Sequence, residues 1–200
     1  MNIAGLGLAG GPTLVVIILC SVMVVTFALE RFFFLRSLEQ RIPALLAALK
    51  QQRPTGGDPA TFLATWPEVL RLPAEVLLAR RPKESLENWR GRLHRALQET
   101  TLELKRFLWV MATVGAMAPF LGLLGTVLGI MRSFNAIGAS GKSGFNVIAS
   151  GLAQALATTA AGILVAIVAV VLFNYFQTRI AGMRVRLTNK LDDILDEFAE

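Results

Sequence analysis

The sequence contains little of the chemistry on which soluble enzymes depend. Only one of its 200 residues is cysteine (Cys20) and only one is histidine (His94). A single cysteine excludes an internal disulfide or thiolate cluster, and a single histidine excludes a two-histidine metal site. A hydrolase relay would have to use His94, which lies in a strongly charged segment with a helical pattern. We therefore expect no metal, no cofactor and no enzyme active site.

Charged residues are also scarce. They make up 17% of the chain, against about 25% in a typical soluble domain, while hydrophobic residues make up 54%. The ranges 1–29, 107–131 and 143–178 contain no charged residue at all. An apolar helix of about 20 residues spans a hydrocarbon core about 30 Å thick. The sequence therefore predicts an all-α integral membrane protein with three transmembrane helices.

The distribution of lysine and arginine predicts the orientation. Fourteen of the 20 basic residues lie in 31–106 and four lie in 179–190, so these parts are expected to face the cytoplasm. This gives an N-out, C-in topology with long helices extending into the cytoplasm. No lysine or arginine precedes the first apolar stretch, which favours a retained membrane helix over a signal peptide. Basic residues beside membrane helices also explain the net charge of +6 without a nucleic-acid partner.

These patterns divide the chain into seven expected segments. In order, they are an outward N-terminal segment (1–11), a first transmembrane helix (12–35), a cytoplasmic helical region (36–106), a second transmembrane helix (107–133), an outward hairpin (134–146), a third transmembrane helix (147–178) and a cytoplasmic helical tail (179–200).

The cytoplasmic region contains most of the prolines, which disfavour a continuing helix. Six of the eight lie there, at Pro43, Pro54, Pro59, Pro67, Pro73 and Pro82. We therefore expect several short helices joined by turns, with 54–59 as the clearest loop. A longer helix is expected to open near Ser85 and to continue through Lys105 into the second span.

The second span has a stripe of small or helix-perturbing residues at spacings of three and four. Its members are Gly115, Pro119, Gly122, Thr126, Gly129 and Ser133. Such spacing puts them on one helix face, and a face of small residues lets neighbouring backbones approach closely. Gly125 and Gly129 form a further pair of this kind. Pro119 frees one backbone carbonyl, which a neighbour or water must satisfy.

The third span has a similar texture. A dense block of small residues is formed by Gly151, Ala153, Ala155, Ala157, Thr158, Thr159, Ala160, Ala161 and Gly162. Gln154 lies just before the two threonines. The two spans therefore look suited to tight packing in an assembly, with a few polar groups at membrane depth.

Each of these features also has a purely structural interpretation. Glycine and alanine stripes often serve packing alone, and a membrane threonine often bonds a carbonyl of its own helix. Gln154 could bridge helices, and such interhelical polar bonds are often worth only about 0.6 kcal/mol. A functional interpretation is favoured because Thr126, Thr158, Thr159 and Gln154 occur together on two small-faced helices.

Two motifs in these spans carry a family resemblance. The sequences APFLGLLGTVLGIM (118–131) and GLAQALATTAAG (151–162) resemble the TolQ/ExbB/MotA proton-channel family. The expected three spans are more similar to TolQ and ExbB than to the four-span MotA. The resemblance implies a bacterial inner-membrane protein that forms a pentamer, with the second and third spans around a pore. Two copies of a single-span TolR/ExbD/MotB-like partner, each carrying an aspartate, would lie inside.

The resemblance also assigns roles to single residues. Thr126 and Thr159 fall at the family's two pore threonines, and Gln154 stands where TolQ and ExbB typically have a glutamate. The expected ion-pathway residues are Thr126, Thr159, Thr158 and Gln154, and the expected packing and kink residues are Pro119, Gly122, Gly125, Gly129, Gly151 and Gly162.

The second and third spans contain no aspartate or glutamate. Because an intramembrane proton carrier needs a titratable group, the carboxylate is expected to come from the partner. We predict a stator or channel subunit of a motor driven by the proton-motive force. A sodium-driven motor subunit and a structural scaffold without ion conduction are the alternatives. The driven process, whether outer-membrane integrity, import or gliding, stays open.

Overall fold

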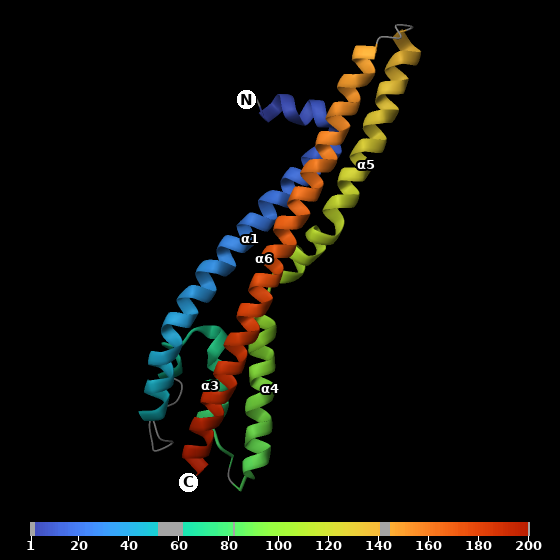
Figure 1. The fold of residues 1–200 in the computed structure, drawn as a ribbon. Coiled ribbons are helices and arrows are strands. Elements are labelled where there is room, and N and C mark those ends of the chain that lie inside the picture. The colour runs from blue at the N-terminus through green and yellow to red at the C-terminus, as the bar shows by residue number, and fades with distance from the viewer. Residues whose placement is uncertain (1–2, 52–61, 82, 141–144, 200) are drawn as a thin grey trace. The chain divides into compact units, whose positions relative to one another are not determined.

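A computed structural model describes residues 3–51, 62–81, 83–140 and 145–199. Over these ranges the chain is helical and has no strand. The helices are α1 (Ile3–Gln51), α3 (Glu68–Leu78), α4 (Leu86–Leu104), α5 (Leu108–Ser140) and α6 (Phe145–Ala199) (Figure 1). Three of them, α1, α5 and α6, are long and apolar enough to cross a membrane. The prediction of an all-α protein with three membrane helices is confirmed, whereas its orientation stays a prediction.

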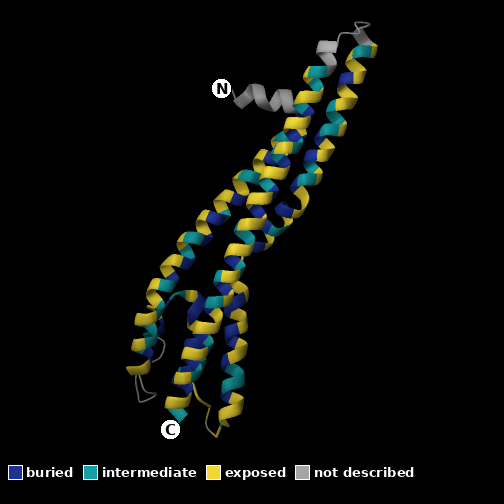
Figure 2. Ribbon diagram, viewed as in Figure 1, coloured by how far each residue is buried: buried dark blue, intermediate teal, exposed yellow. Residues whose placement is uncertain are grey.

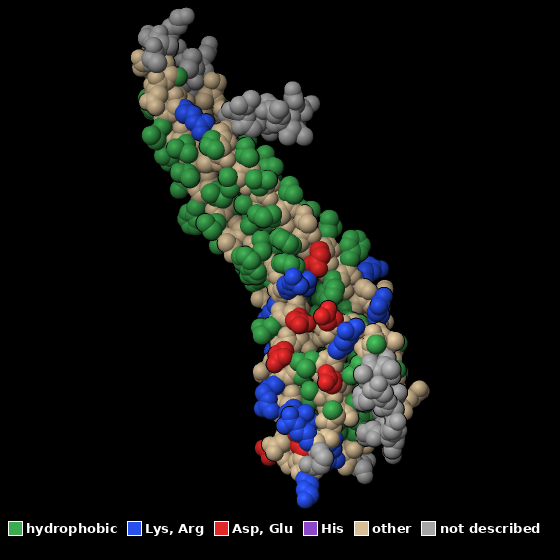
Figure 3. Space-filling view, turned by 180° about the vertical axis from the view of Figure 1, so that it is seen from behind, with side chains coloured by type: hydrophobic (Ala, Val, Ile, Leu, Met, Phe, Trp, Pro, Cys, Tyr) green, Lys and Arg blue, Asp and Glu red, His purple; other side chains and the backbone are tan. Residues whose placement is uncertain are grey.

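The chain folds as two compact units. The first, here the membrane unit, consists of residues 1–29 and 107–175; the second, here the charged unit, consists of 30–106 and 176–200. All 14 acidic residues of the sequence fall in the charged unit. On the face drawn in Figure 3, hydrophobic side chains cover much of the membrane unit, while acidic and basic side chains gather over the charged unit.

In the membrane unit, α5 and α6 pack antiparallel. Their close approaches pair Gly115 with Val170, Gly122 with Thr159 and Gly129 with Ala155, so positions that rise along α5 fall along α6. Helix α1 joins them through a small buried cluster of Val24, Val114, Ala118, Ala166 and Ala169. Buried and exposed positions alternate along the long helices, as expected for helices that pack on one side only (Figure 2).

Helix α1 is interrupted near its start. Gly11 has φ 70° and ψ 179°, a left-handed backbone conformation that glycine adopts without steric cost. Pro12 follows and suits the first position of the helix that resumes there. The interruption places Arg132 of α5 against the Gly11 backbone, where no side chain intervenes.

The predicted continuous helix from the cytoplasmic region into the second span is wrong. Helix α4 ends at Leu104, and Lys105–Phe107 form a turn before α5 begins. Phe107 has φ 67°, which is unusual for a bulky residue. Its ring stacks on Phe27 with centroids 4.7 Å apart. Tertiary contact therefore holds a backbone conformation that the local sequence does not favour.

The expectation that each proline interrupts a helix is also wrong at two positions. Pro43 lies within α1 and Pro73 within α3. Pro73 has no N–H to offer the carbonyl of Val69, four residues earlier. The hydroxyl of Thr100 in α4 donates to that carbonyl instead, at 3.0 Å. The loop expected at 54–59 lies outside the described residues.

In the charged unit, α3 and α4 pack around a buried Trp89. The Trp89 ring is 1% exposed, and its Nε1 donates to the Val76 carbonyl at 2.8 Å. Ion pairs tie α6 to its neighbours: Arg179 meets Glu39 of α1 at 2.6 Å, and Lys50 of α1 meets Glu197 at 2.9 Å. The Glu39 and Lys50 pairs lie on either side of Pro43, and they hold α1 against α6 across the missing backbone bond.

Candidate functional site: a polar seam between α5 and α6

The hydroxyl of Thr159 connects the two small-faced helices. It donates to the Gly122 carbonyl of α5 at 2.7 Å. A methyl group on Gly122 would lie 2.9 Å from the Thr159 Cα, closer than real Cβ contacts allow. The glycine is therefore what permits the hydrogen bond between the helices.

The other two threonines bond within their own helices. Thr126 donates to the Leu123 carbonyl at 2.7 Å, and Thr158 donates to the Gln154 carbonyl at 3.1 Å. Thr158 is 1% exposed, whereas Thr126 and Thr159 are half-buried. In each case the hydroxyl hydrogen is used in a bond to a backbone carbonyl, while the hydroxyl oxygen can still accept a hydrogen bond. Thr126 lies one helical turn beyond Gly122, so this stretch of α5 carries both a hydroxyl and the carbonyl that Thr159 reaches.

The glycines of the stripe mark the closest approaches of the helices. A Cβ added to Gly162 would lie 2.6 Å from the Ala118 carbonyl oxygen, and one added to Gly125 would lie 2.6 Å from the Thr158 methyl. Gly129 likewise faces Ala155, and Gly151 faces Ser133. The predicted packing glycines therefore lie where the helices touch. Pro119 lies inside α5 without ending it.

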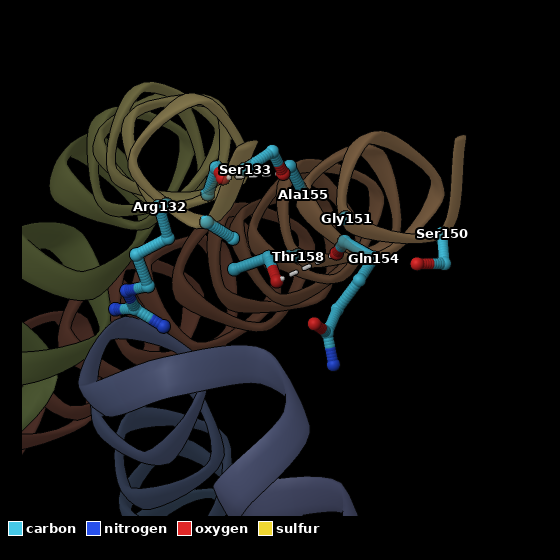
Figure 4. A pocket seen from close by; sticks show the side chains of 10 residues that line it. Arg132, Ser133, Ser150, Gly151, Gln154, Ala155 and Thr158 are labelled. Carbon is cyan, nitrogen blue, oxygen red and sulfur yellow. Dashed lines mark hydrogen bonds between the residues drawn. The ribbon is translucent and has the colours of Figure 1, made fainter. Parts of the chain in front are cut away.

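A polar cavity of about 370 Å³ opens where the C-terminal part of α5 faces the N-terminal part of α6 (Figure 4). Of the predicted residues, it is lined by Gly125, Gly129, Gly151, Gln154 and Thr158. Thr126, Thr159, Gly122 and Gly162 are not among its lining residues. The structure thus separates the predicted residues into two groups. One group surrounds Gly122 outside the cavity, and the other surrounds Gln154 and lines the cavity, here called the cavity level.

Two residues at the cavity level were missed by the sequence interpretation. Arg132 lines the cavity, and the hydroxyl oxygen of Thr13 lies close to Gly125. Thr13 is 7% exposed, and its oxygen has no hydrogen-bond partner among the residues that the structure describes. Arg132 could have been found, because it lies three residues after Gly129 on the same helix face and is the one charged residue in 107–141. Nothing in the sequence links Thr13 to α5.

The charged unit contains a separate carboxylate–arginine site at the start of α4. Glu84 receives hydrogen bonds from the Arg81 backbone N–H at 3.1 Å and from two Arg92 nitrogens at 2.8 Å each. Burial raises the pKa of the Glu84 carboxyl, but these donors outweigh it and hold the pKa below its ordinary value.

His94 lies on the surface of α4. Its Nε2 is 3.1 Å from the Asp192 carboxylate of α6, and its side chain is 45% exposed. Across the described ranges, no cluster of histidine, cysteine or acidic residues could hold a metal ion. The His94–Asp192 contact is a surface hydrogen bond between α4 and α6.

Comparison with known proteins identifies the family to which these helices belong. A family model described as the MotA/TolQ/ExbB proton channel family matches residues 68–189. The chain is 38% identical over 129 residues to a biopolymer transport protein ExbB from Pseudomonas putida, covering 64% of this chain and 38% of that protein. It is 45% identical over 78 residues to an ExbB from Aquifex aeolicus (strain VF5), covering 39% of this chain and 53% of that protein.

A third relative is a putative biopolymer transport protein ExbB-like 1 from Helicobacter pylori (strain J99 / ATCC 700824), 36% identical over 109 residues and 54% of each chain. The chain thus spans between 38% and 54% of the length of these relatives. The family match covers more than half of this chain and includes both helices of the seam. The chain therefore belongs to the MotA/TolQ/ExbB proton channel family and is a multi-pass protein of the bacterial inner membrane.

Proposed function

We propose that the chain is a stator or channel subunit of a motor driven by the proton-motive force. Five copies surround two copies of a single-span TolR/ExbD/MotB-like partner, and each partner carries one membrane aspartate. Thr126 and Thr159 offer hydroxyls to the ion, with Thr158 and Gln154 on the outward side of them. Proton flow is thereby coupled to mechanical work.

The observation that carries this proposal is the distribution of acids. The membrane unit contains no aspartate or glutamate, whereas its two tightly packed helices carry the hydroxyls of Thr126, Thr158 and Thr159 and the amide of Gln154. A hydroxyl or an amide can hold a short chain of water, but neither stores a proton near neutral pH. A titratable group is needed for a proton to cross, so the proposal assigns that group to a partner.

The energy available is adequate for such coupling. One elementary charge that crosses the membrane potential is worth about 2.3 kcal/mol per 100 mV. When a proton neutralises the partner's aspartate, the carboxyl no longer needs the polar face of one subunit. The partner is then free to move to the next of five equivalent faces. The small residues of α5 and α6 let these two helices approach each other closely in each subunit.

The test is to remove each hydroxyl without changing the side-chain shape. Thr126→Val and Thr159→Val should each lower motor output strongly in cells that also express the partner. Thr113→Val is the matched control, since Thr113 is an exposed threonine of α5 that bonds the Trp109 carbonyl of its own helix at 2.8 Å. Normal output from both pore variants with normal assembly would contradict the proposal.

A structural scaffold is the second candidate, because Thr126 and Thr158 donate within their own helices. Under that function the complex would work without ion flow. Dissipating the proton gradient with an ionophore separates the two: a motor stops, whereas a scaffold continues. Replacing sodium by potassium in the medium then tests whether the coupling ion is a proton.

A further inference from the structure

Arg132 is a positive charge that the membrane unit does not neutralise. The unit contains only one other charged residue, Lys142, and no acid. Within the described ranges, Arg132 has no ion-pair partner. Its side chain is exposed, and its guanidinium lies against the Gly11 backbone beside the cavity.

The depth of Arg132 follows from the length of α5. The uncharged stretch 108–131 has a helical length of about 36 Å at 1.5 Å per residue. This exceeds the hydrocarbon thickness of about 30 Å. With one end of α5 at one membrane surface, Arg132 lies at the level of the lipid head groups on the other surface. Phosphate is the anion that is abundant at that level.

Two side chains that line the cavity are hydrogen-bond donors with no acceptor among the described residues. Figure 4 shows Arg132 reaching from α5 towards α1 and Gln154 extending from α6 away from the helix pair. The Ser133 and Thr158 hydroxyls already donate to carbonyls of their own helices, at 3.1 Å each. The guanidinium and the Gln154 amide are donors for which the described residues show no acceptor, and the Thr13 hydroxyl, also without a partner there, lies close to Gly125 of the cavity wall.

The helix surfaces near the cavity are apolar and exposed. Met131 and Phe134 of α5 are 55% and 65% exposed, and Leu156 of α6 is 58% exposed. A ligand that joins an anionic head to apolar chains matches this combination better than a free anion or a peptide carboxylate does. Arginine binds phosphate through two parallel N–H···O bonds.

We propose that this cavity binds the phosphate group of an anionic phospholipid, with Arg132 as the main ligand and Gln154 as a second donor. The lipid chains lie along the exposed apolar residues of α5 and α6. This cavity shares Gln154 and Thr158 with the proposed ion pathway. Its test measures lipid retention by the purified chain, so its outcome can be told apart from a loss of motor output.

The experiment is a titration of the purified full-length chain with phosphatidylglycerol in detergent micelles, followed by native mass spectrometry. Loss of a charge-assisted pair should weaken binding roughly tenfold in Arg132→Gln. Arg132→Lys keeps the charge but not the paired hydrogen-bond geometry, so its lipid affinity should lie between those of the native chain and Arg132→Gln. Arg184→Gln is the matched control, because it removes one exposed arginine from α6 in the charged unit.

Each other outcome counts against the proposal. Equal retention of phosphatidylglycerol by the native chain, Arg132→Gln and Arg132→Lys would overturn it. Complete displacement of the lipid by millimolar inorganic phosphate would identify a free-anion site instead. A co-purifying protein whose retention depends on Arg132, in place of lipid, would assign the cavity to a carboxylate-bearing partner. Should Arg132→Gln fail to fold, the comparison of the native chain with Arg132→Lys decides.

Discussion

The three threonines of the seam differ in what their hydroxyls bind. Thr126 and Thr158 donate within their own helices, while Thr159 donates across to α5. Interhelical bonds in membranes average only about 0.6 kcal/mol, so the Thr159 bond does little for stability. Its larger consequence is to fix the Thr159 oxygen, whose lone pairs remain available, at a defined point beside Gly122.

Gly162 offers a sharp test of the packing at the scale of a single residue. Gly162→Ala places a methyl group 2.6 Å from the Ala118 carbonyl oxygen, so the helices must separate. We expect a loss of about 1–3 kcal/mol in unfolding free energy, as is typical of overpacking. Gly138→Ala in α5 is the control, since its added methyl meets no atom within 4 Å. Equal thermal unfolding midpoints in detergent for the two variants would contradict the packing role.

The candidate site was only partly predictable from the sequence. Spacings of three and four predict which glycines share a helix face, because helical periodicity is a local property. Which carbonyl Thr159 reaches, and that Thr13 approaches Gly125, depend on the packing of three helices. Arg132 falls within the predicted second span, 107–133, but its place beside a cavity depends on how α5 packs against its neighbours.

At the scale of elements, α3 shows how a proline is tolerated inside a helix. Thr100 supplies the hydrogen bond that the Val69 carbonyl cannot receive from Pro73. Both Thr100 and Val69 are buried, so an unsatisfied carbonyl there is costly. The local sequence predicts a break of the helix at Pro73. The helix continues because α4, packed on α3, supplies the hydrogen bond that the Val69 carbonyl would otherwise lack.

A double-mutant cycle tests this compensation. Thr100→Val should lower the unfolding free energy by about 1–3 kcal/mol, because it leaves the Val69 carbonyl without a donor. The same change in a Pro73→Ala background should cost clearly less, since the alanine restores the backbone N–H. Thr101→Val is the control, as that hydroxyl bonds the Leu97 carbonyl of its own helix at 2.7 Å. Additive losses in the cycle, measured by chemical unfolding, would show that the two positions are independent.

The hydrogen bonds of Glu84, just before α4, lead us to expect that the stability of the chain depends on pH. Glu84 has a lowered pKa in the folded chain, so its contribution is fully present above the unfolded value of about 4.3. The contribution is lost as the pH falls through the lower, folded pKa. Glu84→Gln should therefore be less stable than the native chain at pH 6, with the difference shrinking towards pH 3. Glu99→Gln, a change at an exposed glutamate of α4, should show no such trend, and a parallel trend in both variants would exclude a specific role for Glu84.

The elements themselves were predictable where the signal is long and local. Uncharged stretches of 25 residues or more predict membrane helices because no other environment suits them. The junction between α4 and α5 was not predictable, because Phe107 is neither glycine nor asparagine. Its left-handed backbone is held by the ring of Phe27, 80 residues earlier in the chain.

At the scale of the whole molecule, the division of charge is the main feature. All 14 acidic residues lie in the charged unit, whereas the polar side chains of the membrane unit are hydroxyls, amides and two basic residues. The proposed function rests on this division, because a proton that crosses these helices then needs a titratable group from another polypeptide. The family resemblance places Gln154 where TolQ and ExbB typically have a glutamate.

The most direct measurement is proton flux into liposomes that contain the purified protein, under an imposed membrane potential. With the chain alone, we predict flux no greater than that of empty liposomes. Co-reconstitution with the single-span partner should raise the flux, and replacing the partner's membrane aspartate by asparagine should abolish the increase. Strong flux through the chain alone would contradict the account, because it would mean that these helices move protons without a carboxylate from another polypeptide.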